Sequence, residues 1–133
     1  MMEFIITEPP LAQIRHRFGR GRTYDPQADG KKKLEWDFVS QMREKGYSMI
    51  SEGPIACEVT FYMPIAKSLS KRKHMELLDS PASSCSKDLD NLCKYILDVM
   101  NEIVYKDDRL ICKLDAQKIF SSVHRTEIKI YAL

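Results

Sequence analysis

The sequence predicts a small α+β protein in which helices cover one face of a mixed β-sheet. Several segments alternate apolar and polar residues, which is the period of a half-buried strand. Between them lie segments whose apolar residues recur three and four positions apart, as on one side of a helix. The chain has 133 residues, so we expect a single domain over residues 1–133.

The first half of the chain predicts a strand, a basic loop and a helix. The strand is expected at residues 2–7, where apolar and polar side chains alternate. The helix is expected at residues 25–45, because it opens with an acid followed by proline and ends before Gly46. Its apolar stripe consists of Leu34, Phe38 and Met42.

The second half predicts three strands and two helices. Residues 55–63 show the most regular alternation in the chain and predict a strand. A short helix with a basic start is expected within residues 68–79, and a longer amphipathic helix over residues 91–102. The last two strands, residues 110–120 and 126–133, are separated by a short turn and are expected to pair as a hairpin.

Composition excludes several classes of protein. With 30% charged and 44% hydrophobic residues, the chain has the make-up of a globular protein. It contains no apolar run of membrane-spanning length and no signal-peptide pattern, so a cytoplasmic location is expected. The four cysteines and three histidines lack zinc-ligand spacing and predict reduced thiols. The net charge of +2 does not by itself indicate a nucleic-acid binder.

Two acidic pairs flank the longer helix. Asp88 and Asp90 precede it, and Asp107 and Asp108 follow it. Carboxylate oxygens are the ligands that Mg²⁺ prefers, often together with a phosphate group. A structural interpretation competes, because aspartate is also a favoured helix cap and a common turn residue.

One face of the same helix carries a charged row. Asp90, Lys94, Asp98 and Glu102 recur every four residues and are therefore expected on one side. The opposite side is apolar, formed by Leu92, Tyr95, Ile96, Val99 and Ile103. A cation one turn beyond the first acidic pair is suited to a phosphate bound at that pair.

This region resembles the RusA-type Holliday junction resolvases. The resemblance rests on Asp88-Leu89-Asp90-Asn91, Lys94, Leu97-Asp98, Asn101, Val104-Tyr105, Asp107-Asp108 and Lys118. It implies a homodimeric, Mg²⁺-dependent endodeoxyribonuclease, with Mn²⁺ as a substitute, that resolves four-way DNA junctions by paired symmetric nicks in recombination and repair. It implies Asp88, Asp90, Asp108 and Lys94 as catalytic residues, and Asp88, Asp90, Asp107 and Asp108 as metal ligands.

Basic residues elsewhere are candidates for DNA contact. Residues 15–24 hold four arginines with interleaved glycines and aromatics, and they predict a mobile loop that binds phosphate. RusA-type proteins carry a similar stretch after their first strand. A solvated basic surface is the alternative, and for residues 71–73 it is equally favoured. The candidates are Arg15, Arg17, Arg20, Arg22, Lys71, Arg72, Lys73 and, by resemblance, Lys118.

The spacing of the acidic pairs poses a geometric problem. A helix over residues 91–102 is about 18 Å long, so the pairs lie at its opposite ends. Residues 103–107, if extended, reach roughly 17 Å and would bring Asp108 back beside Asp90. We expect this closure within one chain; a site completed by the partner of a dimer is the alternative.

Two other functions remain open from the sequence. One is a Mg²⁺-dependent nuclease for other branched DNA, such as flaps or forks. The other is an inactive DNA-binding protein of the same fold. The presence of all three motif aspartates and of Lys94 argues against loss of catalysis.

Overall fold

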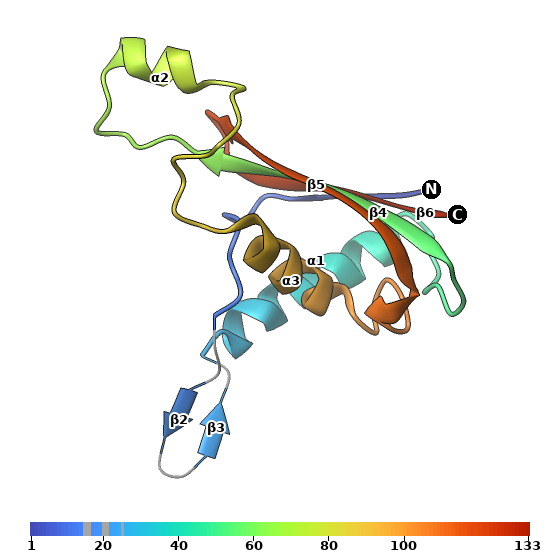
Figure 1. Cartoon of the computed structure of the whole chain (residues 1–133). Coiled ribbons are helices and arrows are strands. Elements are labelled where there is room, and N and C mark those ends of the chain that lie inside the picture. Colours follow the sequence, from blue (N-terminus) through green and yellow to red (C-terminus); the bar gives the residue numbers. More distant parts are fainter. Residues whose placement is uncertain (15–16, 20–21, 25) are drawn as a thin grey trace.

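The structure is a computed structural model that describes residues 1–14, 17–19, 22–24 and 26–133, without the side chains of 17–19 and 22–24. The predicted α+β class is confirmed (Figure 1). The elements in order are β1 (Met2–Ile6), β2 (Arg17–Gly19), β3 (Arg22–Tyr24), α1 (Ala28–Glu44), β4 (Ile55–Pro64), α2 (Lys71–Leu77), α3 (Leu89–Met100), the 3₁₀ turn η1 (Asp108–Leu110), β5 (Ile111–Ser121) and β6 (Arg125–Ala132).

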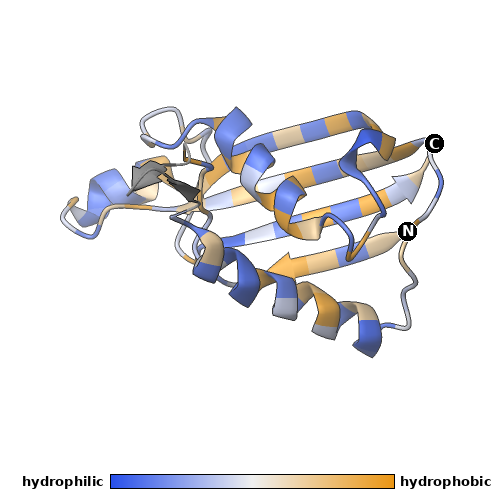
Figure 2. Ribbon diagram, turned by 90° about the horizontal axis from the view of Figure 1, so that it is seen from below, coloured by the Kyte–Doolittle hydropathy of each residue, from blue (hydrophilic) through white to orange (hydrophobic). Residues whose placement is uncertain are grey.

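One four-stranded sheet organises the molecule. Its strand order is β1-β6-β4-β5, with β4 antiparallel to β6 and parallel to β5. Helices α1 and α3 lie across the same face of this sheet, as predicted (Figure 2). Strand β5 therefore forms one edge of the sheet, beside α3.

The expected hairpin between the last two strands is wrong. Strand β4 lies between β5 and β6 and pairs with both. Alternate side chains of β4 are buried along its whole length, so burial places it in the interior of the sheet. The short connection between β5 and β6 passes the end of β4, where Pro64 lies opposite Ser121.

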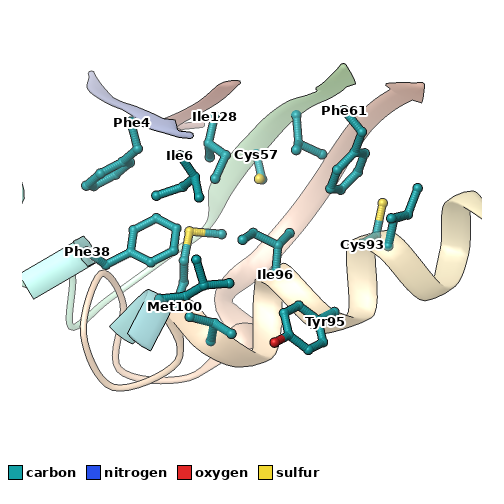
Figure 3. Packing of buried hydrophobic residues seen from close by; sticks show 14 of the residues in the cluster. Phe4, Ile6, Phe38, Cys57, Phe61, Cys93, Tyr95, Ile96, Met100 and Ile128 are labelled. Atoms are coloured by element: carbon teal, nitrogen blue, oxygen red, sulfur yellow. The ribbon is translucent and has the colours of Figure 1, made fainter. Parts of the chain in front are cut away.

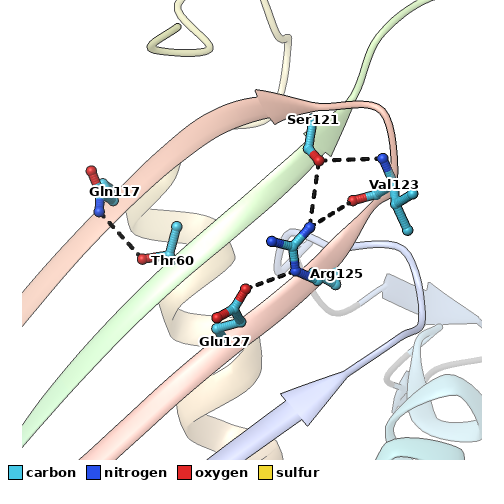
Figure 4. A network of polar contacts seen from close by, with 6 residues as sticks. All are labelled: Thr60, Gln117, Ser121, Val123, Arg125 and Glu127. Atoms are coloured by element: carbon cyan, nitrogen blue, oxygen red, sulfur yellow. Dashed lines mark hydrogen bonds and ion pairs between the residues drawn. The ribbon is translucent and has the colours of Figure 1, made fainter. Parts of the chain in front are cut away.

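Arg125 secures this connection. Its guanidinium donates to Glu127 Oε2 over 2.7 Å, to Ser121 Oγ over 3.4 Å and to the carbonyl oxygen of Val123 over 3.2 Å (Figure 4). It also stacks 3.6 Å above the ring of Tyr62 on β4. These contacts tie the last turn to the strand that it crosses.

The basic segment is not a featureless loop. Its described residues form a two-stranded antiparallel ribbon, with Phe18 opposite Thr23 and Arg17 opposite Tyr24. The ribbon extends away from the sheet (Figure 1). Phenylalanine, threonine and tyrosine favour strands, and the arginines between them obscured this preference in the sequence.

The core fills the space between the sheet and the two helices. Both predicted helical stripes face it, and side chains from β1, β4 and β6 complete it (Figure 3). The ring of Phe4 meets Phe38 edge-on, with 5.3 Å between centroids, which joins β1 to α1. In the part of the chain that the structure describes, no helix is long and apolar enough to span a membrane.

Candidate functional site

A groove of about 830 Å³ runs between α3 and the edge strand β5. Apolar side chains form its walls: Leu89, Cys93 and Leu97 from α3, and Leu114 and Ala116 from β5. Charged side chains also line it: Lys31, Asp90, Lys94, Asp98 and Asp108. The groove thus joins residues from α1, α3, η1 and β5.

The charged row on α3 lies along this groove. Asp90, Lys94 and Asp98 are exposed, while the other side of the helix is buried in the core. The predicted common face is therefore confirmed for these three residues, whereas Glu102 lies in the turn after the end of α3. Asp90 and Asp98 are two turns apart, about 12 Å along the helix axis.

Asp88 begins α3 as its N-cap residue. Its backbone is extended, and its exposed side chain makes no capping hydrogen bond. The competing interpretation of Asp88 as a side-chain cap is thus not supported. The carboxylate remains accessible beside the first turn, which also contains Asp90.

Lys118, which the resemblance offers as a DNA contact, makes hydrogen bonds within the chain. Its ammonium donates to the carbonyl oxygens of Lys87, over 2.6 Å, and Cys85, over 3.3 Å. These two residues lie in the segment just before Asp88. Lys118 on β5 therefore holds the segment that leads into α3 against the edge strand of the sheet.

The second acidic pair lies in the turn that leads to β5. Asp107 caps η1, where its Oδ1 accepts from the N–H of Arg109 over 3.0 Å. The N–H of Asp108 donates to Asn101 Oδ1 over 3.1 Å, which fixes Asp108 at the C-terminal end of α3. Burial raises the pKa of Asp108, and a hydrogen bond to Asp107 and the charges of Asp107 and Asp98 raise it further.

The expected extended return of residues 103–107 is wrong. Residues 101–105 form a turn, in which the N–H of Glu102 donates to the carbonyl oxygen of Tyr105 over 2.8 Å. Val104 and Tyr105 are fully buried, and the Tyr105 hydroxyl donates to Leu97 O over 2.6 Å. The burial of Val104 and Tyr105 thus takes residues 103–105 into the core, and the chain does not run back along α3 toward Asp90.

The two acidic pairs consequently stay at opposite ends of α3. Asp108 lies near Asp98, whereas Asp88 and Asp90 lie at the helix start. Among the described residues, no three His, Cys, Asp or Glu side chains form a group that could hold a metal ion. Mg²⁺ commonly binds through only one or two carboxylates, with waters and phosphate completing its shell. The aspartates suit Mg²⁺ chemically, but one chain does not assemble them.

Lys31 is a groove residue that the sequence did not indicate. It begins a run of three lysines, of which Lys32 and Lys33 are exposed whereas Lys31 is buried. Its ammonium lies 3.0 Å from Asp98 Oδ2 and 5.6 Å from the centre of the Tyr95 ring. Lys31 therefore neutralises the acid that neighbours Asp108.

The basic candidates lie on two outlying elements. Arg15 and Arg20 fall outside the described residues, and Arg17 and Arg22 begin the two strands of the ribbon. The base of the ribbon is held to α3, because the N–H of Gln13 donates to Asn91 O over 2.8 Å. The ribbon thus starts beside the Asp90 end of the groove.

The other basic group lies on α2, whose residues are not buried. Lys71, Arg72 and Lys73 are exposed there. Arg72 and Lys73 both lie near Glu76, at 3.5 and 3.8 Å, which reduces the positive charge that they present.

Thiol chemistry does not fit the groove. Burial raises the pKa of Cys93 to about 11, and that of Cys57 to about 12. A thiol that stays protonated is a poor nucleophile and metal ligand. The acidic and basic side chains are therefore the groups available for chemistry.

Comparison with known proteins gives two results. The model of the family described as Endodeoxyribonuclease RusA matches residues 8–131. The chain is also similar to the uncharacterized protein YqaN of Bacillus subtilis (strain 168), with 28% identity over 137 residues, covering 97% of this chain and 94% of that protein.

Proposed function

We infer the function from one premise: the chain belongs to the Endodeoxyribonuclease RusA family. Its class of reaction is then hydrolysis of phosphodiester bonds in DNA. We propose that it resolves four-way junctions by paired symmetric nicks, in recombination and repair. The supporting observation is the groove, which carries Asp90 and Lys94 toward the end where the basic ribbon starts and Asp108 toward the other end.

The proposed metal is Mg²⁺, with Mn²⁺ as a substitute. Asp88 and Asp90 of one chain would hold it together with Asp108 of the partner subunit, assisted by the partner's Asp107. Two observations support this shared site: the acidic pairs lie at opposite ends of α3, and one described chain forms no three-residue metal group. When bound, the ion would polarise the scissile phosphate and lower the pKa of a bound water.

The chain's own residues supply binding and orientation. Lys94, exposed one turn from Asp90, would offset negative charge that develops on the phosphate. Asn101 Oδ1 accepts a hydrogen bond from the backbone N–H of Asp108 and so keeps Asp108 in place. The arginines of the ribbon would grip the DNA backbone and set its direction into the groove.

A homodimer suits this substrate. A four-way junction has approximate twofold symmetry, and a C2 dimer presents two identical sites related by the same operation. Sites shared between chains exist only in the dimer, which couples cleavage to correct assembly. Recognition of the junction would depend on its shape and backbone contacts.

A nicking assay on the full-length chain tests the proposal. Labelled synthetic four-way, Y-shaped and linear duplex DNA would be incubated with Mg²⁺, with Mn²⁺ or with EDTA. We expect symmetric nicks in opposing strands of the four-way junction, only with a divalent ion. Preferred cleavage of Y-shaped DNA would transfer the proposal to forks and flaps. Binding of the junction without cleavage under every condition would refute catalysis.

A further inference from the structure

Gln13 lines the groove at the end where α3 begins. Its backbone N–H donates to Asn91 O over 2.8 Å, and its Nε2 donates to Ile14 O over 3.3 Å. Its Oε1 is buried and has no hydrogen-bond partner among the residues that the structure describes. A buried acceptor without a donor destabilises the free protein, so a donor that reaches Oε1 is bound favourably.

The groove walls beside Gln13 are apolar and formed partly by small side chains. Lys118 is held to the residues before α3, and β5 begins after η1 at the far end, so β5 and α3 run in opposite directions. Ala116 of β5 therefore lies at the same end of the groove as Leu89 and Cys93 of α3. The groove volume of about 830 Å³ is within the range of roughly 300–1,000 Å³ that is typical of small-ligand sites. This end suits a flat ring held between two apolar walls.

The charges at this end favour DNA as the source of the ring. Lys94 lines the groove one turn from Asp90 and has the charge to hold a phosphate. The base of the arginine-containing ribbon is held to α3 at the same end, through Gln13. One sugar joins the phosphate and the base of a nucleotide, so a phosphate beside Lys94 brings its base to the groove. Enzymes that extrude a base clamp its faces between apolar or aromatic side chains and read its edge by hydrogen bonds.

We propose that the groove takes one unstacked nucleobase of the bound DNA, and that Gln13 is a specificity-determining residue whose Oε1 accepts a hydrogen bond from the exocyclic amino group of that base. The inference rests on the proposed function, because the base belongs to the strand that is held for cleavage. Cytosine, adenine and guanine carry such an amino group, and thymine does not. The subsite therefore disfavours thymine at one position beside the branch point.

The orientation of the Gln13 amide sets this preference. The last torsion of a glutamine side chain is soft, so a small rotation presents Oε1 to the groove while Nε2 stays near the carbonyl oxygen of Ile14. The reversed amide would place Oε1 against that carbonyl oxygen, and two acceptors repel each other. Gln13 therefore offers the base an acceptor, and a donor that would suit a thymine carbonyl is held elsewhere.

A branch point lowers the cost of extruding the base. Unpairing and unstacking cost least where a base is already poorly paired. The strands of a four-way junction exchange partners at the branch, so the base pairs there open most easily. A continuous duplex bears the full cost at every position. Occupation of the groove would thus favour branched DNA over linear duplex.

The competing role for Gln13 is to hold the ribbon to α3. Its backbone N–H already makes that link to Asn91, and this bond does not need the side chain. The side-chain bond from Nε2 is long, at 3.3 Å, and reaches only the next residue, Ile14. Neither bond uses the buried Oε1. The structural role therefore leaves the acceptor unexplained.

Base analogues that lack the amino group test the subsite on the native, full-length chain. Labelled four-way junctions would be titrated without divalent ion, which separates binding from nicking. In each junction one cytosine near the branch is replaced by 2-pyrimidinone, or one adenine by purine, at both symmetry-related positions. We expect one position at which the dissociation constant rises about tenfold, the effect of one unmade hydrogen bond. Weaker pairing of the analogue in free DNA would act in the opposite direction. Equal affinities at every position would overturn the base site.

Two variants assign the reading to Gln13. Gln13→Leu removes the acceptor, whereas Gln13→Glu keeps an acceptor and removes the donor to Ile14. The ratio of the two dissociation constants, with and without the amino group, is taken within each variant, so a general loss of affinity cancels. We expect the ratio to fall to about one in Gln13→Leu and to stay near tenfold in Gln13→Glu. Gln117→Leu is the matched control and should keep the ratio, because the Gln117 amide bonds Thr60 outside the groove.

The other outcomes overturn the assignment. Loss of the ratio in both Gln13 variants would show that the side chain acts through its bond to Ile14. A ratio that persists in Gln13→Leu would mean that another residue reads the base. The analogue series on the native chain tests the base site even if a variant does not fold.

Fluorescence of 2-aminopurine tests whether the base leaves the stack. This analogue keeps an exocyclic amino group, and its emission rises when it is unstacked. At the position found above, we expect it to brighten when the native chain or Gln117→Leu binds without metal. No brightening would overturn occupation of the groove. Nicking with Mg²⁺ is measured separately. Amino-group dependence without nicking would refute the nuclease and leave the base site standing, whereas nicking without such dependence would refute the base site alone.

Discussion

Lys31 on α1 reaches across to α3, where its Nζ lies 3.0 Å from Asp98 Oδ2. The Lys31 side chain is 10% exposed, and that of Asp98 is 55% exposed. The ion pair therefore links the buried Lys31 of α1 to the exposed Asp98 at the rim of the groove. It balances one of the charges that raise the pKa of Asp108, and it connects the two helices that cover the sheet.

Two substitutions separate packing from charge at Lys31. Lys31→Met keeps an apolar stem of similar length in the buried site, so we expect a loss of at most about 1 kcal/mol in the free energy of unfolding. Lys31→Ala also removes the packing and should cost about 2 kcal/mol. Urea unfolding of both variants measures the difference. Equal losses would show that the charge, and not the stem, carries the stabilisation.

Asp90→Asn should abolish nicking of a four-way junction and preserve or tighten its binding. The change removes a proposed metal ligand and also one negative charge that faces DNA. Gel-shift and nicking assays on the same preparation measure both effects. Asp29→Asn, on the exposed start of α1, is the control and should cut normally. Loss of binding in Asp90→Asn would contradict the assigned role.

The ribbon arginines should set the salt dependence of DNA binding. Replacing Arg15, Arg17, Arg20 and Arg22 with alanine should weaken junction affinity. The slope of log K against log salt should become shallower by about 0.9 for each DNA phosphate that an arginine no longer neutralises. Arg43→Ala, in the last turn of α1, serves as the control. A slope that does not change would remove the ribbon from the binding surface.

Asp108 should make the folded chain less stable near neutral pH. The fold raises the pKa of Asp108 above the ordinary 3.8, so the folded chain favours the protonated carboxyl group. The contribution of this group to stability is therefore fully present below pH 3.8, and it is lost as the pH rises through the raised pKa. Asp108→Asn should therefore melt at a higher temperature than the native chain at pH 7. This gain should disappear on acidification below the ordinary value.

Melting curves across pH, without and with Mg²⁺, measure this effect. Asp29→Asn is again the control, because an acid in the first turn of a helix is stabilising and its loss should give no gain. A lower melting temperature for Asp108→Asn at pH 7 would show that its carboxylate is favourably paired in the fold.

Local patterns predicted most of the elements but not how the strands pair. The stripe Leu34, Phe38 and Met42 and the alternation from Ile55 to Met63 are local signals, and both survive in the structure. The hairpin prediction failed because adjacency in sequence does not show that a third strand inserts between two others. Burial of β4 decides that arrangement, and burial depends on the whole sheet.

The candidate site shows the same division. Spacing alone placed Asp90, Lys94 and Asp98 on one face of α3. It did not show that Val104 and Tyr105 are buried, which stops the chain from returning to Asp90. Nor did it separate Lys31, which is buried and paired, from its exposed neighbours. Each of these facts depends on packing between distant segments.

Mixing two inactive variants tests whether the site is shared between chains. Asp90→Asn and Asp108→Asn should each lack nicking activity alone. If Asp90 of one chain works with Asp108 of the partner subunit, a mixed dimer has one site with both native aspartates and one site with neither. Random exchange would then restore roughly a quarter of the native number of sites.

The restored activity should consist of single nicks, since each mixed dimer has one working site. The measurement is the nicking rate of the four-way junction after the two variants are mixed and allowed to exchange. The matched control is a mixture of native chain with a double Asp90→Asn, Asp108→Asn variant, whose mixed dimers contain no complete shared site. If the active site instead lay within a single chain, the control mixture would keep its activity and the two single variants would stay inactive together.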